Sequence, residues 1–188
     1  MKGPCKLEQL LPAPLKKQAV AVGAALVLAA GSVFGIGGAK LAAYESRTAA
    51  SFSQGQYSIA ADLSARENSA ANLVTVAEKT AGLDAALADA VRAAIEAAQA
   101  AQGPAEKARA DTALADAVNA LYDAASRLAD QNQYDLLAGE LAEFNSRGNT
   151  IRNNDYNSNA QAFNKALEGP LARLIGALWG VKEAEYFE

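Results

Sequence analysis

The most apolar part of the chain lies near its N-terminus. Between Lys17 and Lys40, the 22 residues from Gln18 to Ala39 carry no charge. A helix of that length rises about 33 Å, which matches the hydrocarbon thickness of a bilayer. Alanine and glycine dilute the valines and leucines, so the segment is only moderately hydrophobic. The pattern predicts a transmembrane anchor over residues 18–40.

A cleavable signal peptide is the alternative interpretation of this segment. The apolar region of a signal peptide is usually about 7 to 15 residues long and ends at a small-x-small cleavage site. Here the apolar region is longer, and the large residue Leu41 would stand third before a cut after Ala43. We expect an uncleaved anchor. Under the alternative, the mature chain would begin near residue 43 or 44 and would be an exported soluble bundle that binds a partner.

Apolar residues beyond residue 43 recur at helical spacing. They predict four helices, over residues 41–76, 84–102, 114–131 and 134–167, although Gly55 lies in a Ser-rich run that weakens the middle of the first. No stretch alternates apolar and polar residues convincingly enough to predict a strand. Because each helix is apolar along one side only, the helices are expected to pack together. The predicted fold class is all-α, with an N-terminal transmembrane helix followed by an elongated antiparallel helical bundle.

The last twenty residues contain a short amphipathic pattern. Its apolar residues fall at i, i+3, i+4, i+7 and i+8: Leu171, Leu174, Ile175, Leu178 and Trp179. Such a helix could lie on a membrane or enter a partner's groove, or it could fold back to close the bundle. The predicted organisation therefore has four parts: a basic tail (1–17), the anchor (18–40), the bundle (41–168) and a C-terminal amphipathic segment (169–188).

The charge distribution predicts an orientation. Four lysines precede the anchor, whereas Lys40 and Arg47 are the only cations in the next 20 residues. Short cation-rich loops stay in the cytoplasm, so the N-terminus is expected inside and the bundle outside. Residues 1–43 hold five lysines against one glutamate, for +4, and residues 44–188 hold 12 cations against 20 anions, for −8. An acidic bundle does not favour nucleic acid as a partner.

The composition excludes several kinds of catalytic chemistry. The sequence has no histidine, and its one cysteine is Cys5 in the N-terminal tail. Zinc sites of the Cys/His type, Ser-His or Cys-His pairs and intrachain disulfides are therefore excluded. A carboxylate pair such as Glu140 and Glu143 could serve acid-base chemistry but fits a solvated helix face better. We expect no enzyme activity, cofactor or metal, and we expect Cys5 to be a reduced thiol rather than a lipidated one.

The last predicted bundle helix is unusually rich in asparagine, a mediocre helix former. Seven asparagines occur in twenty residues: Asn145, Asn149, Asn153, Asn154, Asn157, Asn159 and Asn164. They could form a polar face that pairs with other helices or with a partner. Alternatively, they could form a solvated face with a turn or fraying near Gly148.

Short motifs in this region resemble the C-terminal end of the LemA family. They are Tyr156-Asn157, Phe163, Gly169-Pro170-Leu171, residues 176–182 and residues 185–188, with Arg66 and Asn72-Leu73-Val74 upstream. The likeness extends over residues 41–188. Ala71 and Asn153 stand where that family usually has proline and arginine, so any role of that proline or arginine does not transfer.

The resemblance implies a single-pass bacterial membrane protein with a helical bundle and no established enzymatic activity. It also implies a bundle in the cytoplasm, because relatives often have basic residues just after the anchor, whereas the charge count of this chain favours the outside of the cytoplasmic membrane. We expect a membrane-anchored interaction module whose partners are the bilayer, through residues 18–40, and a second copy or another membrane protein. Tyr156, Asn157 and the five apolar residues of the C-terminal pattern are the candidate contact residues.

Overall fold

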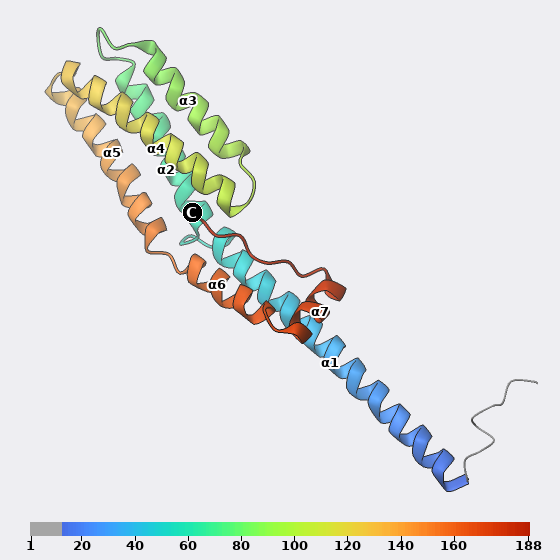
Figure 1. The fold of residues 1–188 in the computed structure, drawn as a ribbon. Helices are drawn as coiled ribbons and strands as arrows, with labels where there is room; N and C mark the ends of the chain where they lie inside the picture. The colour runs from blue at the N-terminus through green and yellow to red at the C-terminus, as the bar shows by residue number, and fades with distance from the viewer. Residues whose placement is uncertain (1–12) are drawn as a thin grey trace, which may run out of the picture. The chain divides into compact units, whose positions relative to one another are not determined.

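The computed structural model describes residues 13–188, with side chains from residue 17 onward except at residue 19. The expectations for the basic tail up to residue 12, including Cys5, lie outside the described residues. Over the described range the chain forms helices and no strand (Figure 1), so the predicted all-α fold with a long apolar N-terminal helix and a bundle is confirmed. The helices are α1 (Ala13–Ser53), α2 (Ile59–Ala77), α3 (Ala85–Ala100), α4 (Gly103–Leu128), α5 (Gln131–Arg152), α6 (Tyr156–Leu167) and α7 (Pro170–Trp179).

The helices belong to two compact units. The first, the α1–α7 unit, contains the chain up to Tyr44 together with Leu167–Lys182. The second, the bundle unit, contains Glu45–Ala166 and the tail Glu183–Glu188. This division differs from the linear scheme of an anchor, a bundle and a terminal segment, because the last six residues return to the bundle unit.

The predicted helix over residues 41–76 is interrupted where its composition is weakest. Its first part continues the apolar segment as one helix to Ser53, and Gly55 then takes a left-handed conformation with φ +90°. The α2 helix starts after Ser58, whose hydroxyl accepts a hydrogen bond from the Ala61 N–H at 3.2 Å. Glycine tolerates positive φ and serine is a favoured N-cap, so the local sequence both ends α1 and begins α2.

The predicted single helix over residues 134–167 is wrong, because α5 ends at Arg152 and α6 begins at Tyr156. Asparagine side chains make this turn. The Asn153 amide donates to the Asn149 carbonyl at 2.9 Å, and the Asn154 side-chain oxygen accepts from the Tyr156 N–H at 2.9 Å. Asparagine bonds nearby backbone groups in non-helical conformations, which is why the break falls here. Gly148, where the sequence suggested fraying, is helical.

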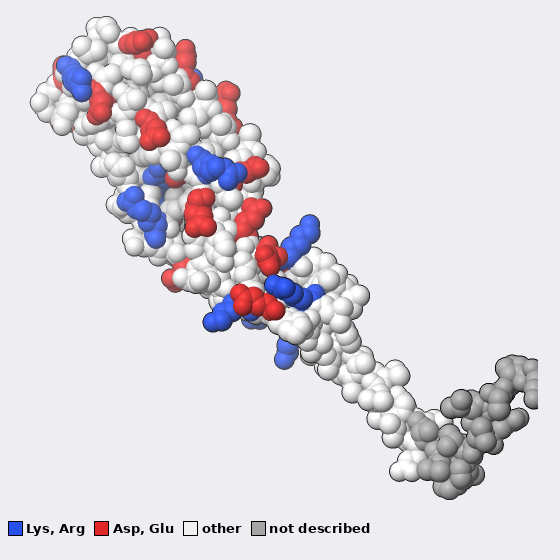
Figure 2. Space-filling view, in the orientation of Figure 1, with Lys and Arg blue, Asp and Glu red and all other residues white. Residues whose placement is uncertain are grey.

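In the bundle unit, α2, α3, α4 and α5 follow one another up and down around a shared core. The most extensive packing joins α2 to α5 and α3 to α4. Within this core Val91, Val118, Leu121 and Leu137 are fully buried. Along α4, for example, the buried residues recur every three to four positions, so the helix buries one side and leaves its charges on the other: Leu114, Val118, Leu121 and Ala125. Figure 2 shows those acidic and basic side chains distributed over the surface of the bundle.

Candidate functional site

The described N-terminal half of α1 exposes its apolar side chains in all directions. A stretch from Val20 to Ser53 is long and apolar enough to cross a membrane, and none of its most apolar part is buried. Val27, for example, is 73% exposed. No charged residue lies between Lys17 and Lys40, and the visible face of this stretch carries no charge in Figure 2. A helix that is apolar all round is normally covered by protein or by lipid.

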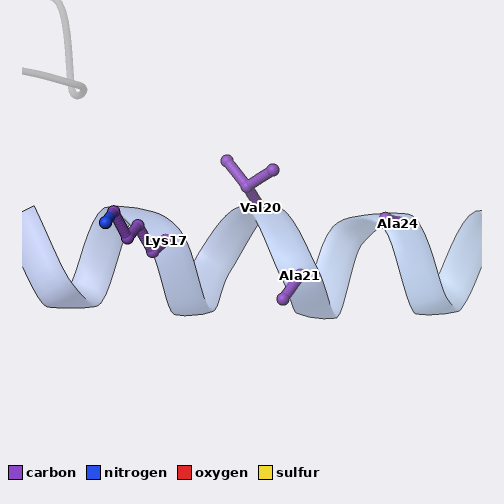
Figure 3. A pocket seen from close by; sticks show the side chains of 4 residues that line it. All are labelled: Lys17, Val20, Ala21 and Ala24. Carbon is purple, nitrogen blue, oxygen red and sulfur yellow. The ribbon is translucent and has the colours of Figure 1, made fainter.

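A lysine marks one end of this apolar surface. Lys17, Val20, Ala21 and Ala24 line a shallow open hollow on α1, and Figure 3 shows Val20 and Ala21 pointing away from the helix on different sides. Lys17 is the only charged residue of the four. A lysine at this position can keep its ammonium in water while its aliphatic stem lies on the apolar surface.

The α7 helix packs on α1 at the other end of the apolar segment. The indole N–H of Trp179 donates a hydrogen bond to the Phe34 carbonyl at 3.1 Å. A Cβ built on Gly38 would lie 2.0 Å from the Trp179 indole nitrogen, and one built on Gly37 would lie 3.2 Å from an Ile175 methyl. Two adjacent glycines therefore let α7 approach the α1 backbone closely, as small residues do between membrane helices.

The opposite side of α7 is uncovered. Ile175 faces α1 and is buried, whereas Leu171, Leu174 and Leu178 are each more than half exposed. The helix ends at Gly180, which has φ +70°, and the Val181 N–H closes the last turn on the Gly176 carbonyl at 2.9 Å. This is a glycine C-cap, after which the chain is extended. The amphipathic pattern thus forms the predicted helix, but its packing partner in this unit is α1.

In the bundle unit, two asparagines of α6 hold the extended C-terminal tail. Asn164 accepts from the Ala184 N–H at 2.8 Å and donates to the Ala184 carbonyl at 2.9 Å. Asn157 makes the same pair with Phe187, at 2.8 Å and 3.0 Å. The seven helical residues from Asn157 to Asn164 rise about 10.5 Å, and the three extended residues from Ala184 to Phe187 span about 10 Å. The spacing of the two asparagines therefore matches the spacing of the two tail residues that they bind. Each amide side chain pairs with the tail as a neighbouring strand would.

Aromatic side chains complete this contact with the tail. The Tyr156 hydroxyl donates to the Glu185 carbonyl at 2.7 Å, and Phe52 contacts Tyr156 edge-to-face with ring centroids 5.1 Å apart. Phe187 also packs against Phe52, with ring centroids 6.0 Å apart. Burial raises the pKa of the Tyr156 hydroxyl, and the nearby Glu185 carboxylate raises it further. The neutral phenol that donates this hydrogen bond is therefore favoured.

The structure places the predicted contact residues in two separate groups. Tyr156 and Asn157 bind the tail of the same chain in the bundle unit, and the five apolar residues of α7 lie in the other unit. Sequence reasoning placed Asn164 on a possible polar face but not among the candidate contact residues, and it missed the tail residues that Asn164 holds. The spacing of Asn157 and Asn164, seven residues apart on one helix face, was the available signal. Five of the seven asparagines make side-chain hydrogen bonds: Asn149, Asn153, Asn154, Asn157 and Asn164. Three of them, Asn154, Asn157 and Asn164, bind segments distant in the sequence, which a simply solvated face would not do.

A buried polar cluster joins three helices of the bundle unit. The Arg66 guanidinium of α2 donates to Asp111 of α4 at 2.6 Å and to the Phe144 carbonyl of α5 at 2.9 Å. It also lies over the Phe144 ring, 3.8 Å from the centroid. A Cβ at Gly148 would meet the Arg66 guanidinium at 2.1 Å, so glycine makes the space for this arginine.

The carboxylates of this region pair with neighbouring cations or, at Glu140, with an amide. Burial raises the pKa of Asp111, and the Arg66 charge opposes that shift. Asp62 is buried and pairs through one oxygen with Arg147 at 3.3 Å. Glu143 pairs with the same arginine at 2.7 Å, and Glu140 accepts from the Asn72 amide at 3.3 Å. Glu140 and Glu143 therefore each have a partner on the surface of the bundle.

A bundle core joined in sequence to a long exposed apolar helix defines a class: helical-bundle proteins with one candidate membrane-spanning helix. Residues 56–188 match the sequence profile of the LemA family, so the chain belongs to the LemA family. The resemblance described from short motifs is thereby confirmed over that range. No curated protein and no solved structure matches the chain significantly.

Proposed function

We propose that this LemA family protein is a single-pass membrane protein whose helical bundle acts by binding, as a scaffold or membrane-organising module, without catalysis. Residues 18–40 hold it in the bacterial cytoplasmic membrane, and the bundle lies on the outer side. The observation that carries the proposal is that the helical stretch from Val20 to Val33, which lies within the uncharged segment Gln18 to Ala39, is exposed at every residue. In water, that much apolar surface is unfavourable; in hydrocarbon it is the ordinary state of a helix.

The packing of α7 supports an anchor that is retained. Cleavage near residue 43 would remove Gly37 and Gly38, which lie against Ile175 and Trp179. It would also interrupt α1, which runs unbroken to Ser53. The released chain would expose a face of α7 that is now buried.

The interaction role is supported by the kinds of surface that the described residues present. The carboxylates of the polar cluster each have a partner within the protein. The α6 helix, by contrast, recognises an extended peptide backbone through paired amide contacts. Such backbone contacts are a common basis of peptide binding.

Membrane attachment and cleavage are tested together on the full-length chain expressed in bacterial cells. We expect carbonate-washed membranes to retain the protein with its original N-terminus, measured by sedimentation and intact mass. Extraction by carbonate, or a mature chain that begins near residue 43, would contradict the proposed anchor and favour the exported soluble bundle.

Orientation is tested with the single cysteine. A membrane-impermeant maleimide added to intact cells should leave Cys5 unlabelled. It should label a Cys5→Ser variant that carries Ala93→Cys on the exposed side of α3. The reverse pattern would place the bundle in the cytoplasm.

Partner binding is tested by crosslinking in native membranes followed by capture through a tag. Defined oligomers or a defined co-purifying membrane protein are expected. A monomer with no reproducible partner would contradict the interaction role.

A further inference from the structure

We infer that α7 is a second membrane-contacting element, which lies in the boundary between headgroups and acyl chains of the same bilayer that holds α1. The inference rests on the proposed membrane anchor and goes beyond it, because it assigns the exposed leucines of α7 to lipid. The partner is the hydrocarbon of the lipid, not a protein groove.

The contacts of α7 fix its depth once α1 is embedded. Trp179 donates to the carbonyl of Phe34, which lies five residues before Ala39 at the end of the uncharged segment. Five helical residues correspond to about 8 Å along the axis. Interfacial helices bury their apolar face about 5 to 10 Å into this boundary. If residues 18–39 of α1 lie in the hydrocarbon, Trp179 therefore lies at the depth that interfacial helices reach.

The start of α7 lies near the end of the membrane segment. A shallow hollow of about 470 Å³, lined almost entirely by apolar atoms, is bounded by Lys40 and Leu41 of α1 and by the first turns of α7 from Gly169 to Ile175. Lys40 is the first charge after the uncharged segment, and it marks the headgroup level. The α7 helix therefore runs from this level at its first residues towards the acyl chains at Trp179.

The uncovered face of α7 has the chemistry of lipid contact. Leu171, Leu174 and Leu178 are exposed, and Leu178 is 69% exposed. Val33 and Ile36 of α1, in the turns that α7 packs against, are exposed too. The two helices therefore present apolar side chains at the same level of one compact unit. Arg173 is an exposed cation of α7 that can reach the headgroups.

The ends and the length of α7 fit this boundary. The ten residues of α7 span about 15 Å, which is too short to cross the hydrocarbon. The chain that enters the hydrocarbon with α7 must therefore leave it on the same side. The return is made at Gly180, where the Val181 N–H and the Gly180 N–H satisfy carbonyls of the last turn. Backbone groups must be paired internally wherever water is scarce. Trp179, half exposed beside Gly38, has the mixed character that places tryptophan at membrane interfaces.

Trp179 is the only tryptophan, so its fluorescence reports on α7 alone. The test uses the full-length protein in phosphatidylcholine vesicles whose acyl chains carry bromine either close to the headgroups or near the bilayer centre. We expect shallow bromines to quench Trp179 more strongly than deep ones, and aqueous iodide to quench it weakly. Flotation of the same vesicles measures attachment through α1 independently.

Two variants, each with a matched control variant, sharpen the result. Leu171→Ser with Leu174→Ser and Leu178→Ser should reduce quenching by shallow bromines, while Leu136→Ser, an exposed leucine of α5, should leave it unchanged. Gly38→Ala should displace Trp179 and change its quenching, while Gly35→Ala, whose Cβ would meet nothing within 4 Å, should not. Circular dichroism checks that each variant folds.

The outcomes separate this inference from the proposed anchor. Vesicles that float with the protein while iodide, and not bromine, quenches Trp179 would overturn the inference and leave the anchor intact. Blue-shifted Trp179 emission that neither iodide nor bromine quenches would show that protein covers α7. That result would also overturn the inference. Protein that fails to float would contradict the anchor itself.

Discussion

The uncharged segment of α1 and the helices of the bundle unit are built from the same residues, mainly alanine, valine and leucine, yet these side chains are exposed in α1 and buried in the bundle. Val91 and Val118 of the bundle are fully buried, whereas Val27 of α1 is 73% exposed. The bundle helices carry charges along their other sides; the α1 segment carries none. The comparison teaches that the distribution of charge around a helix, more than its content of apolar residues, determines whether protein or lipid must cover it.

The same two regions use glycine in the same way. Gly38 of α1 makes room for Trp179, and Gly148 of α5 makes room for Arg66. In the α1–α7 unit the space receives an indole, while in the bundle it receives a guanidinium that pairs with Asp111. Each close approach therefore brings a large side chain against a helix backbone, and each can be blocked by one methyl group.

The largest expected effect comes from placing charges in the proposed membrane segment of α1. Val27→Arg with Leu28→Arg places two guanidiniums at the centre of the anchor, each costing about 2.5 to 3.5 kcal/mol on insertion. Carbonate extraction should then release most of the protein from membranes. As the matched control, Asp123→Arg with Gln131→Arg on the bundle surface should leave extraction unchanged. If carbonate-washed membranes still retained the Val27→Arg, Leu28→Arg variant, the absence of charge in α1 would not explain its difference from the bundle helices.

Next in size is a pair of adjacent leucines in α5. Leu137 is fully buried in the bundle core, and Leu136 is 59% exposed. Leu137→Ala should lower the free energy of unfolding by about 2 to 5 kcal/mol, because it removes buried contacts and leaves a cavity. Leu136→Ala should change it by less than about 0.5 kcal/mol. Equal losses in urea denaturation would mean that the core is not where the structure places it.

Two glycines of α5 provide a test of the Arg66 cluster. Gly148→Ala should destabilise the bundle by about 2 kcal/mol, since its Cβ would lie 2.1 Å from Arg66 and disturb a buried, paired charge. Gly139→Ala, which meets nothing within 4 Å, should instead stabilise it by about 0.5 to 1 kcal/mol through helix propensity. Thermal denaturation of the two variants measures whether each substitution lowers or raises the stability. Stabilisation by both would show that Arg66 does not require a glycine at residue 148.

The two asparagine contacts with the C-terminal tail can be removed separately, and each removal should affect mainly its own tail residue. Asn164→Ala removes the acceptor of the Ala184 N–H, and Asn157→Ala removes that of the Phe187 N–H. Each should cost about 0.5 to 1.5 kcal/mol. Amide hydrogen exchange should speed up chiefly at the residue that lost its acceptor, with Asn159→Ala on the exposed side of α6 as the control. Unchanged exchange would show that the tail is not held by α6.

The smallest expected effect is a pH dependence at Asp111. Its pKa is raised in the folded protein, chiefly by burial. The folded state therefore binds this proton more tightly than the unfolded state does. The resulting contribution to the free energy of unfolding is fully present below the unfolded pKa of about 4 and is lost as pH rises through the folded pKa. The free energy of unfolding of the wild type should thus fall relative to Asp111→Asn as pH rises above about 4. A difference that grows in the opposite direction would mean that the Arg66 charge outweighs burial.

Much of the secondary structure follows from the sequence because it depends on neighbours. The uncharged segment, the stripes such as that of Leu114 to Leu128, and the amphipathic pattern of α7 all have helical periods, and all are helical. The error over residues 134–167 also has a local cause. Apolar periodicity continues across the turn, and only the capping chemistry of Asn153 and Asn154 shows where α5 ends.

The sequence by itself determined an all-helical chain with an uncharged apolar segment and a family membership over residues 56–188. Only the tertiary structure decided that Asn157 and Asn164 hold the tail, that Arg66 joins three helices, and that α7 packs on α1. These contacts join residues between 20 and 145 positions apart. Helical periodicity reports which side of a helix is apolar, but not which distant segment meets it. That choice depends on whether shapes and hydrogen-bonding groups fit together, as at Gly38 and Asn164.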